Sequence, residues 1–218
     1  MNVNHLSGKV ERPEQSTPVE VVRKGRLDLM VLQTMARKIT VTLRALQQIG
    51  EKALPLSYAF EEWRGRQHRM IIFAPQELLT SEEMRFVGFV SGRNETAEQH
   101  IVDAIFRADE LMLAELARIP GLLSYSSLEL RPCTWYNLVL FRDPGVKSHV
   151  KGIDAHRHAA YLLSPAYYAW IRLNNGVLSG GLARPEWHLN NTKHYRFFGA
   201  QQPPVVREVT YETCTGAC

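Results

Sequence analysis

The order of strand-like and helix-like patterns after residue 83 constrains the fold of this chain more than any other feature. The first four segments are an apolar strand-like run, a helical face and two runs that alternate apolar with polar residues, over residues 84–91, 96–116, 122–130 and 135–141. Pro120-Gly121 ends the helical face, and Arg131-Pro132 turns the chain between the two alternating runs. These residues therefore predict strand, helix, strand and strand.

A second helical region and a last strand complete this part of the chain. We expect a helix over residues 146–163, and Ser164-Pro165 supplies an N-cap and a first-turn proline for a further helix that runs to Gly176. After a loop, residues 193–198 predict the last strand. The full order is that of a ferredoxin-like split βαβ unit, so we expect an α+β fold with both helices on one face of the sheet.

A long helix precedes this unit. Its apolar residues recur three and four positions apart, as on a heptad seam, at Leu29, Leu32, Ala36, Ile39, Leu43 and Leu46. Further apolar residues widen this face, which favours packing onto the helix's own domain, although the same helix of a second subunit stays open as a partner. We expect an N-terminal helical extension and connector with one short strand (1–83), the α+β domain (84–199) and a C-terminal tail (200–218).

The basic charge of the chain is concentrated in this helix. Residues 20–52 hold seven basic and three acidic side chains, an excess that equals the net charge of +4 of the whole chain. A basic segment attracts nucleic acid or an anionic membrane face, but no aromatic side chains are interleaved with these bases. Nucleic acid is therefore not the expected partner.

The remaining composition predicts a cytoplasmic protein. No stretch reaches about 18 uninterrupted apolar residues, so we expect no membrane span, and the first eighteen residues lack the apolar core of a signal peptide. Cys133, Cys214 and Cys218 cannot all pair within one chain and lie outside any cluster of histidines. We expect reduced thiols and neither a disulfide framework nor a zinc site.

Histidines and arginines crowd the segment between residues 135 and 182. His149 and His156 are seven residues apart and would share one face of a continuous helix, whereas His158 would point away. They lie too far apart for one metal ion, so His156 alone is the candidate metal ligand, with His149 supporting it. Arg157 and Arg172 are candidate partners for acidic groups of a cofactor or substrate. Each of these residues is equally explained as a surface or hydrogen-bonded group.

The start of the strand over residues 135–141 supplies the candidate catalytic residues. By alternation, Trp135 and Asn137 face one side of the sheet and Tyr136 faces the other. An Asn–Trp pair can line a cavity in which a substrate oxygen is polarised. A half-buried strand start accounts for the same two residues without any chemistry.

Residues 84–199 resemble the dimeric α/β-barrel superfamily in the order of their elements. The strand over residues 135–141 and the His-bearing helix after it resemble those of the superfamily's small and haem-binding monooxygenases. The segment from Trp170 to Gly181 is similar to the Trp-containing helix and Gly-rich turn of the spheroidene monooxygenase group. The resemblance implies a homodimer that joins two sheets, monooxygenase chemistry, and haem as a candidate cofactor. The N-terminal extension and the insert before Lys193 are not part of the common plan.

Two functions follow from these observations. The first is a small-molecule enzyme, an oxidoreductase of monooxygenase type with an apolar aromatic cavity, in which Asn137 and Trp135 position the substrate and His156 holds haem iron or orders the ligand. The second is a non-enzymatic ligand-binding or assembly protein whose basic heptad helix docks to a partner. The sequence leaves open the substrate and whether the chain is an enzyme at all.

Overall fold

The structure is a computed structural model that describes residues 17–47, 54–62 and 65–212. Its framework is one eight-stranded sheet in which every neighbouring pair of strands is antiparallel. The strands are β1 (Leu56–Glu62), β2 (Arg66–Ile72), β3 (Glu83–Arg93), β4 (Leu122–Arg131), β5 (Thr134–Phe141), β6 (Tyr168–Ser179), β7 (Glu186–Arg196) and β8 (Val205–Thr210). Across the sheet they lie in the order β1-β2-β4-β5-β3-β6-β7-β8, so β5 and β3 are central.

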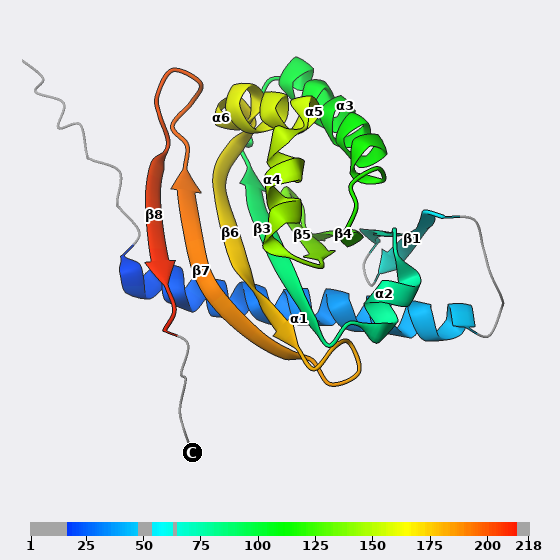
Figure 1. Ribbon diagram of the computed structural model, residues 1–218. Coiled ribbons are helices and arrows are strands. Elements are labelled where there is room, and N and C mark those ends of the chain that lie inside the picture. The colour runs from blue at the N-terminus through cyan, green and yellow to red at the C-terminus, as the bar shows by residue number, and fades with distance from the viewer. Residues whose placement is uncertain (1–16, 48–53, 63–64, 213–218) are drawn as a thin grey trace, which may run out of the picture.

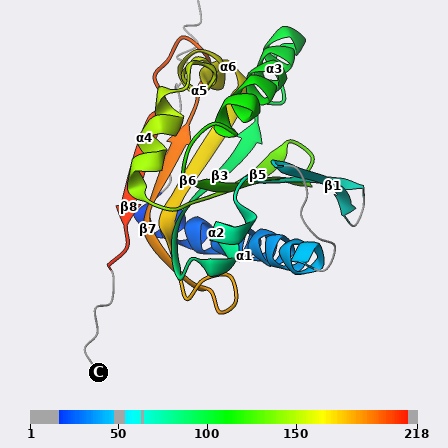
Figure 2. The ribbon, with the colours of Figure 1, turned by 45° about the vertical axis from the view of Figure 1, so that its right-hand side comes forward.

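Helices cover both faces of this sheet (Figure 1). One long helix, α1 (Pro18–Gln47), crosses the first face from β8 towards β1. The chain connects β2 to β3 through a short helix, α2 (Pro75–Thr80). The second face carries α3 (Gln99–Leu116), α4 (Pro144–Gly152), α5 (Asp154–His158) and α6 (Ser164–Tyr167), with a π-helical turn (Ala159–Leu163) before α6. Figure 2 shows α1 and the α3–α6 group on opposite sides of the strands.

The apolar seam of α1 forms the main core together with the sheet. Leu32, Ile39 and Leu43 are almost fully buried against side chains such as Phe86 and Leu138. A glycine on β3 allows this close approach, because a Cβ atom at Gly88 would lie 2.2 Å from Leu32 Cδ1. The seam therefore packs on the helix's own sheet, as its width predicts, and is not free to dock to a partner.

The α+β class and the N-terminal helix are confirmed. The sheet is larger than expected, because β1 and β2 form a hairpin from the connector and β8 comes from the segment after residue 199. The elements β3, α3, β4, β5, α4–α6 and β6 follow one another in the predicted order. The last of them begins at Tyr168, well before the expected strand over residues 193–198, which overlaps the end of β7.

The helix predicted from Ser164 to Gly176 is wrong. Only its first four residues are helical, and β6 follows directly. Burial alternates along β6 from Arg172 onwards, with Arg172 and Asn174 buried towards α1 and Leu173 and Asn175 half-buried on the other face. This period of two, with aromatic residues at the start of the strand, outweighs the helix-start signal of Ser164-Pro165.

The helix expected over residues 146–163 is interrupted at Ile153. The backbone of Ile153 is extended (ψ 129°), so α4 ends at Gly152 and α5 begins at Asp154. The Ile153 side chain is buried in an apolar cluster with Val146, which anchors the break between the two helices. The spacing of seven residues between His149 and His156 consequently no longer places them on one helical face.

Candidate functional site

A row of side chains crosses the face of the sheet that α3–α6 cover, at the level of Asn137. Directly paired residues of antiparallel strands point to the same side, so the strand register defines this row. From β2 to β7 it contains Arg69, Ser127, Asn137, Phe89, Leu173 and Lys193. Trp135 lies on the same face two residues before Asn137, whereas Tyr136 points to α1. The two catalytic candidates from the sequence are thus neighbours on a central strand.

Some side chains at the centre of this face are less buried than those packed under the helices. One hydrophobic cluster lies under α4 and the C-terminal half of α3, and a second lies between the N-terminal half of α3 and α6. On the central strands, the apolar side chains of Phe89, Trp135 and Leu173 belong to neither cluster and are only half-buried. We call these three residues, together with Asn137 and Tyr168, the Asn137 patch.

The buried amide oxygen of Asn137 distinguishes this patch. Oδ1 of Asn137 is inaccessible to solvent and has no hydrogen-bond partner within the described part of the chain. Burying such an acceptor without a partner costs about 1–3 kcal/mol, so native structures contain few of them. The arrangement fits a ligand that donates an O–H or N–H group to Asn137.

Aromatic rings and phenols border the patch. The ring of Tyr168 meets Phe89 edge-on with 5.7 Å between centroids, and it meets Tyr167 in the same way at 4.7 Å. Burial raises the pKa of Tyr168, and the adjacent Tyr167 phenol adds to the effect. Tyr168 is therefore a neutral phenol at physiological pH.

A second phenol closes the β2–β4 side of the patch. Tyr125 Oη donates to Asp109 Oδ1 on α3 (3.4 Å), and Arg69 Nη2 donates to Asp109 Oδ2 (2.5 Å). Burial, followed by the Asp109 charge, raises the pKa of Tyr125. This network ties α3 to the sheet and does not include Asn137.

The histidine candidates lie on the helices above the same face. His156 on α5 is half-buried, and burial together with the nearby Lys151 charge lowers its pKa, so the imidazole is neutral. His149 on α4 and His158 on α5 are exposed. Arg157 is also exposed and lies 3.6 Å from Asp154. Within the described residues there is no group of three or more His, Cys, Asp or Glu side chains that could hold a metal ion.

Arg172 lies on the opposite face of the sheet, under α1. Its Nε and Nη2 donate to Asp28 Oδ2 and Oδ1, each at 2.7 Å. Asp28 also accepts from Asn174 Nδ2 (3.1 Å) and Tyr136 Oη (3.2 Å), and Thr192 donates to Asn174 Oδ1 (2.7 Å). Asp28 is 1% exposed, so this is a buried, fully bonded ion pair that fixes α1 to three strands. The structure thus separates Arg172 from Trp135, Asn137 and His156 by the thickness of the sheet.

Ser126, His68 and Glu62 have the hydrogen-bond pattern of a hydrolase triad. Ser126 Oγ lies 2.8 Å from His68 Nε2, and His68 Nδ1 lies 3.1 Å from Glu62 Oε1. Burial lowers the pKa of His68, which keeps the ring neutral. Ser126 is nevertheless completely buried beneath α1. No substrate reaches its hydroxyl, so we assign this trio to the packing of β1, β2 and β4.

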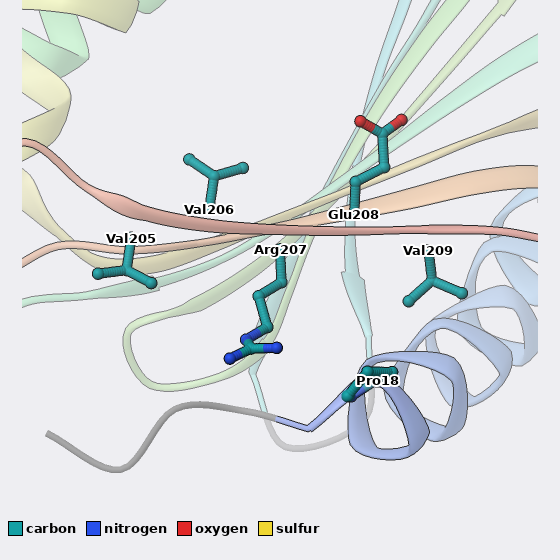
Figure 3. Close-up of a pocket in the computed structure, with 6 residues that line it drawn as sticks. All are labelled: Pro18, Val205, Val206, Arg207, Glu208 and Val209. Atoms are coloured by element: carbon teal, nitrogen blue, oxygen red, sulfur yellow. The ribbon is translucent and has the colours of Figure 1, made fainter.

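A shallow pocket of about 280 Å³ lies where α1 begins beside the edge strand β8 (Figure 3). Val205, Arg207 and Val209 point towards Pro18, whereas Glu208 points to the other face, where it pairs with Lys193 (2.9 Å). The pocket offers no cluster of acid, base and nucleophile. It is therefore not a candidate active site.

No protein-family model matches the chain, and no curated protein matches it significantly. Two solved structures are similar to it at 14% sequence identity. One is protein SO0527 from Shewanella oneidensis, with a TM-score of 0.37 over 44% of this chain and 94% of that chain. The other is a major regulator of staphylococcal pathogenesis, with a TM-score of 0.34 over 60% of this chain and 73% of that chain. Neither similarity is strong enough to support a function.

Sequence reasoning missed several residues of the site and of its support. Phe89 was part of a predicted strand, but its place beside Asn137 depends on the pairing of β3 with β5. Tyr168 was assigned to a helix and in fact starts β6. Asp28 was counted only as one of the three acidic residues of the basic segment, although its position four residues before Leu32 places it beside the apolar seam. That position was the one available signal of burial.

Proposed function

We propose that the chain is a small-molecule enzyme of monooxygenase type whose substrate is a flat aromatic molecule that carries a hydroxyl group. The observation that carries this proposal is the buried, unpartnered Oδ1 of Asn137 among half-buried aromatic side chains. A substrate hydroxyl that donates to this oxygen removes the cost of leaving it unpaired. Phe89 and Trp135 supply apolar surface for the rings, and Tyr168 supplies a neutral phenol at the border.

The reaction class comes from the resemblance of residues 84–199 to small monooxygenases. An electron-rich substrate can itself supply all four electrons that reduce O₂. In the oxidation of 1,8-dihydroxyanthrone, for example, one oxygen atom becomes a carbonyl of the anthraquinone product and the other leaves as water. Asn137 would hold the substrate through its hydroxyl and thus present the reactive carbon to O₂ in a fixed orientation.

Haem, which the resemblance implies as a candidate cofactor, fits the residues present poorly. His156 is neutral and half-buried, as an axial ligand would be. Arg172, however, is saturated by Asp28 on the far side of the sheet, and Arg157 is exposed beside Asp154. Neither of the two candidate arginines is placed to bind a propionate next to His156. No step of the proposed reaction therefore goes through haem.

We also propose that residues 84–199 are a ferredoxin-like unit. The adjacent strands β6-β3-β5-β4, with α3 and α4–α6 on one face, support this. In the resembling superfamily two such sheets meet in a homodimer, but here α1 covers the face that would meet the partner. We therefore propose a site that is complete within one chain. Analytical ultracentrifugation tests this directly, because a dimer in which both copies are needed for activity would contradict it.

Oxygen consumption tests the proposed activity. We expect purified protein to accelerate O₂ uptake by 1,8-dihydroxyanthrone, and we expect Asn137→Leu to lose about 10–100-fold of the rate. Asn190→Leu, at an exposed position of β7, is the matched control and should retain the full rate. Equal rates in all three proteins, or no uptake above the spontaneous rate, would contradict the proposal.

A separate measurement tests whether the protein binds haem. Titration of the protein with haemin should give no stoichiometric Soret band if the fit is as poor as the arginine positions indicate. A Soret band that is lost in His156→Ala and kept in His149→Ala would contradict this point and restore haem as the cofactor.

A further inference from the structure

The solvent-facing side of α1 carries a second regular stripe, opposite the buried seam. Exposed apolar and basic residues recur three and four positions apart on this side, at Val19, Arg23, Arg26, Leu27, Met30, Arg37, Val41 and Arg44. At 100° per residue, these eight positions fall within an arc of about 100°, centred on the far side of the helix from Leu32 and Ile39. We call them the outer stripe. It spans about 38 Å along the helix axis.

The outer stripe is cationic because α1 keeps its acidic residues away from it. Asp28 is buried against Arg172, and Glu20 pairs with Lys24 at 2.5 Å. Lys38 is likewise engaged, by Glu62 at 3.4 Å. No ion pair involving the four arginines of the outer stripe occurs within the described residues. The stripe therefore presents four guanidinium groups to any anionic partner.

The stripe also exposes large aliphatic side chains. Val19 is 77% exposed, Met30 64%, Val41 63% and Leu27 51%, and these four are interspersed with the arginines along the helix. A helix that serves only to pack on its sheet has no need of this apolar surface in water. The combination fits a partner that is both anionic and able to take up hydrocarbon.

We propose that the outer stripe of α1 binds the surface of an anionic lipid bilayer. The aliphatic side chains enter the boundary between headgroups and acyl chains, while the arginines lie at the level of the lipid phosphates. Nucleic acid would leave the aliphatic side chains unused, and the stripe has no aromatic ring for base stacking. A second copy of the chain that docked α1 on α1 would bring four arginines against four arginines. This inference is independent of the activity proposed above.

Co-sedimentation of the full-length protein with vesicles tests the proposal. We expect binding to phosphatidylcholine vesicles that contain about one third phosphatidylglycerol, and little binding to phosphatidylcholine alone. Arg23→Glu with Arg37→Glu should lower the partition coefficient by more than about 25-fold, since each arginine contributes roughly a factor of five at such a surface. The matched control is Arg107→Glu with Arg118→Glu, two exposed arginines that lie on α3 and in the turn directly after it. Figure 2 shows α3 on the opposite side of the sheet from α1.

Several outcomes would overturn the lipid assignment. Equal losses in the two double variants would show a general charge effect and not the outer stripe. Equal binding to neutral and anionic vesicles would remove the role of the arginines, and a full-strength partition of Leu27→Gln with Met30→Gln would remove that of the aliphatic side chains. Binding of a DNA duplex that is lost only in the α1 variant, without vesicle binding, would assign the stripe to nucleic acid. Circular dichroism should show unchanged folding, because all the substituted side chains are exposed.

Discussion

At the scale of single residues, the buried amide oxygen of Asn137 lowers the stability of the free protein and offers a hydrogen-bond acceptor to a ligand. Its buried Oδ1 has no hydrogen-bond partner among the residues that the structure describes, and such a position is typical of a site that is held ready for a ligand. Alternation along the strand over residues 135–141 predicts that Asn137 shares a face with Trp135, and the structure agrees. The partner of Arg172 could not be predicted, because Asp28 lies 144 positions away and no local pattern joins them.

Asn137→Leu should make the free protein more stable. The substitution removes an unpaired buried acceptor and adds apolar surface of similar size, so we expect the free energy of unfolding to rise by about 1–2 kcal/mol. Urea denaturation of the variant, with Asn190→Leu as a control within about 0.5 kcal/mol of the unsubstituted protein, measures this. A loss of stability in Asn137→Leu would mean that the amide makes a structural bond.

His194 should make stability depend on pH. Burial, and then the charges of Arg172, Lys24 and Arg196, lower the pKa of His194 to about 4, against about 6.5 in the unfolded chain. Between pH 6.5 and pH 4 the unfolded state binds a proton at His194, whereas the folded state leaves this imidazole neutral. The contribution of His194 to stability is therefore full above pH 6.5 and is lost as the pH drops towards 4. The loss at His194 should reach about 2 kcal/mol at pH 5.

Thermal unfolding of His194→Gln at pH 7.5 and pH 5 checks this expectation. The variant should lose less stability between the two values than the unsubstituted protein does. Some slope should remain, because burial also lowers the pKa of His68 and of His156. Parallel losses in the two proteins would show that His194 does not titrate in this way.

At the scale of elements, α1 is an internal layer of the fold on one side and a solvent-exposed surface on the other. The heptad spacing of its seam was visible in the sequence, and so was the preference for packing on its own domain. The outer stripe was not predicted: sequence reasoning placed Met30 with the residues that widen the buried seam, whereas Met30 is 64% exposed on the opposite side of α1. The element that sequence reasoning mistook is β6, where a strong local helix-start signal at Ser164-Pro165 competed with the alternation that follows.

Two substitutions on α1 should have very different effects on stability. Ile39 is fully buried in the core against the sheet, so Ile39→Ala should cost about 2–5 kcal/mol. Val41 is 63% exposed on the same helix, and Val41→Ala should change stability by no more than about 0.5 kcal/mol. Urea denaturation measures both. Similar effects of the two substitutions would contradict the orientation of α1.

At the scale of the whole molecule, the eight-stranded sheet is a single structure with two differently used faces. One face is sealed by α1, and the other is covered by α3–α6 with the Asn137 patch at its centre. Strand pairings that extend the sheet, such as those of β1, β2 and β8, join residues far apart in the sequence. The order of strand, helix, strand, strand and helix between residues 84 and 163 was therefore predictable, whereas β6 and the full width of the sheet were not.

Removal of residues 1–52 should prevent independent folding of the remainder. Without α1, the side chains of the main core on β2–β6, such as Met70, Phe86 and Leu138, would face water. We expect the truncated chain to aggregate or to bind anilinonaphthalene sulfonate without a cooperative unfolding transition. A monomeric or dimeric remnant that unfolds cooperatively would show instead that α1 is a separable docking element.

The site on the Asn137 patch is tested most directly by the binding of two matched probes, 2-naphthol and 2-methylnaphthalene, which differ in the group that can donate to Oδ1. Isothermal titration should show about tenfold tighter binding of 2-naphthol to the unsubstituted protein, and this preference should vanish in Asn137→Leu while 2-methylnaphthalene binds the variant at least as well. A preference for 2-naphthol that survives in Asn137→Leu, or the failure of both probes to bind the unsubstituted protein, would contradict a ligand site at Asn137.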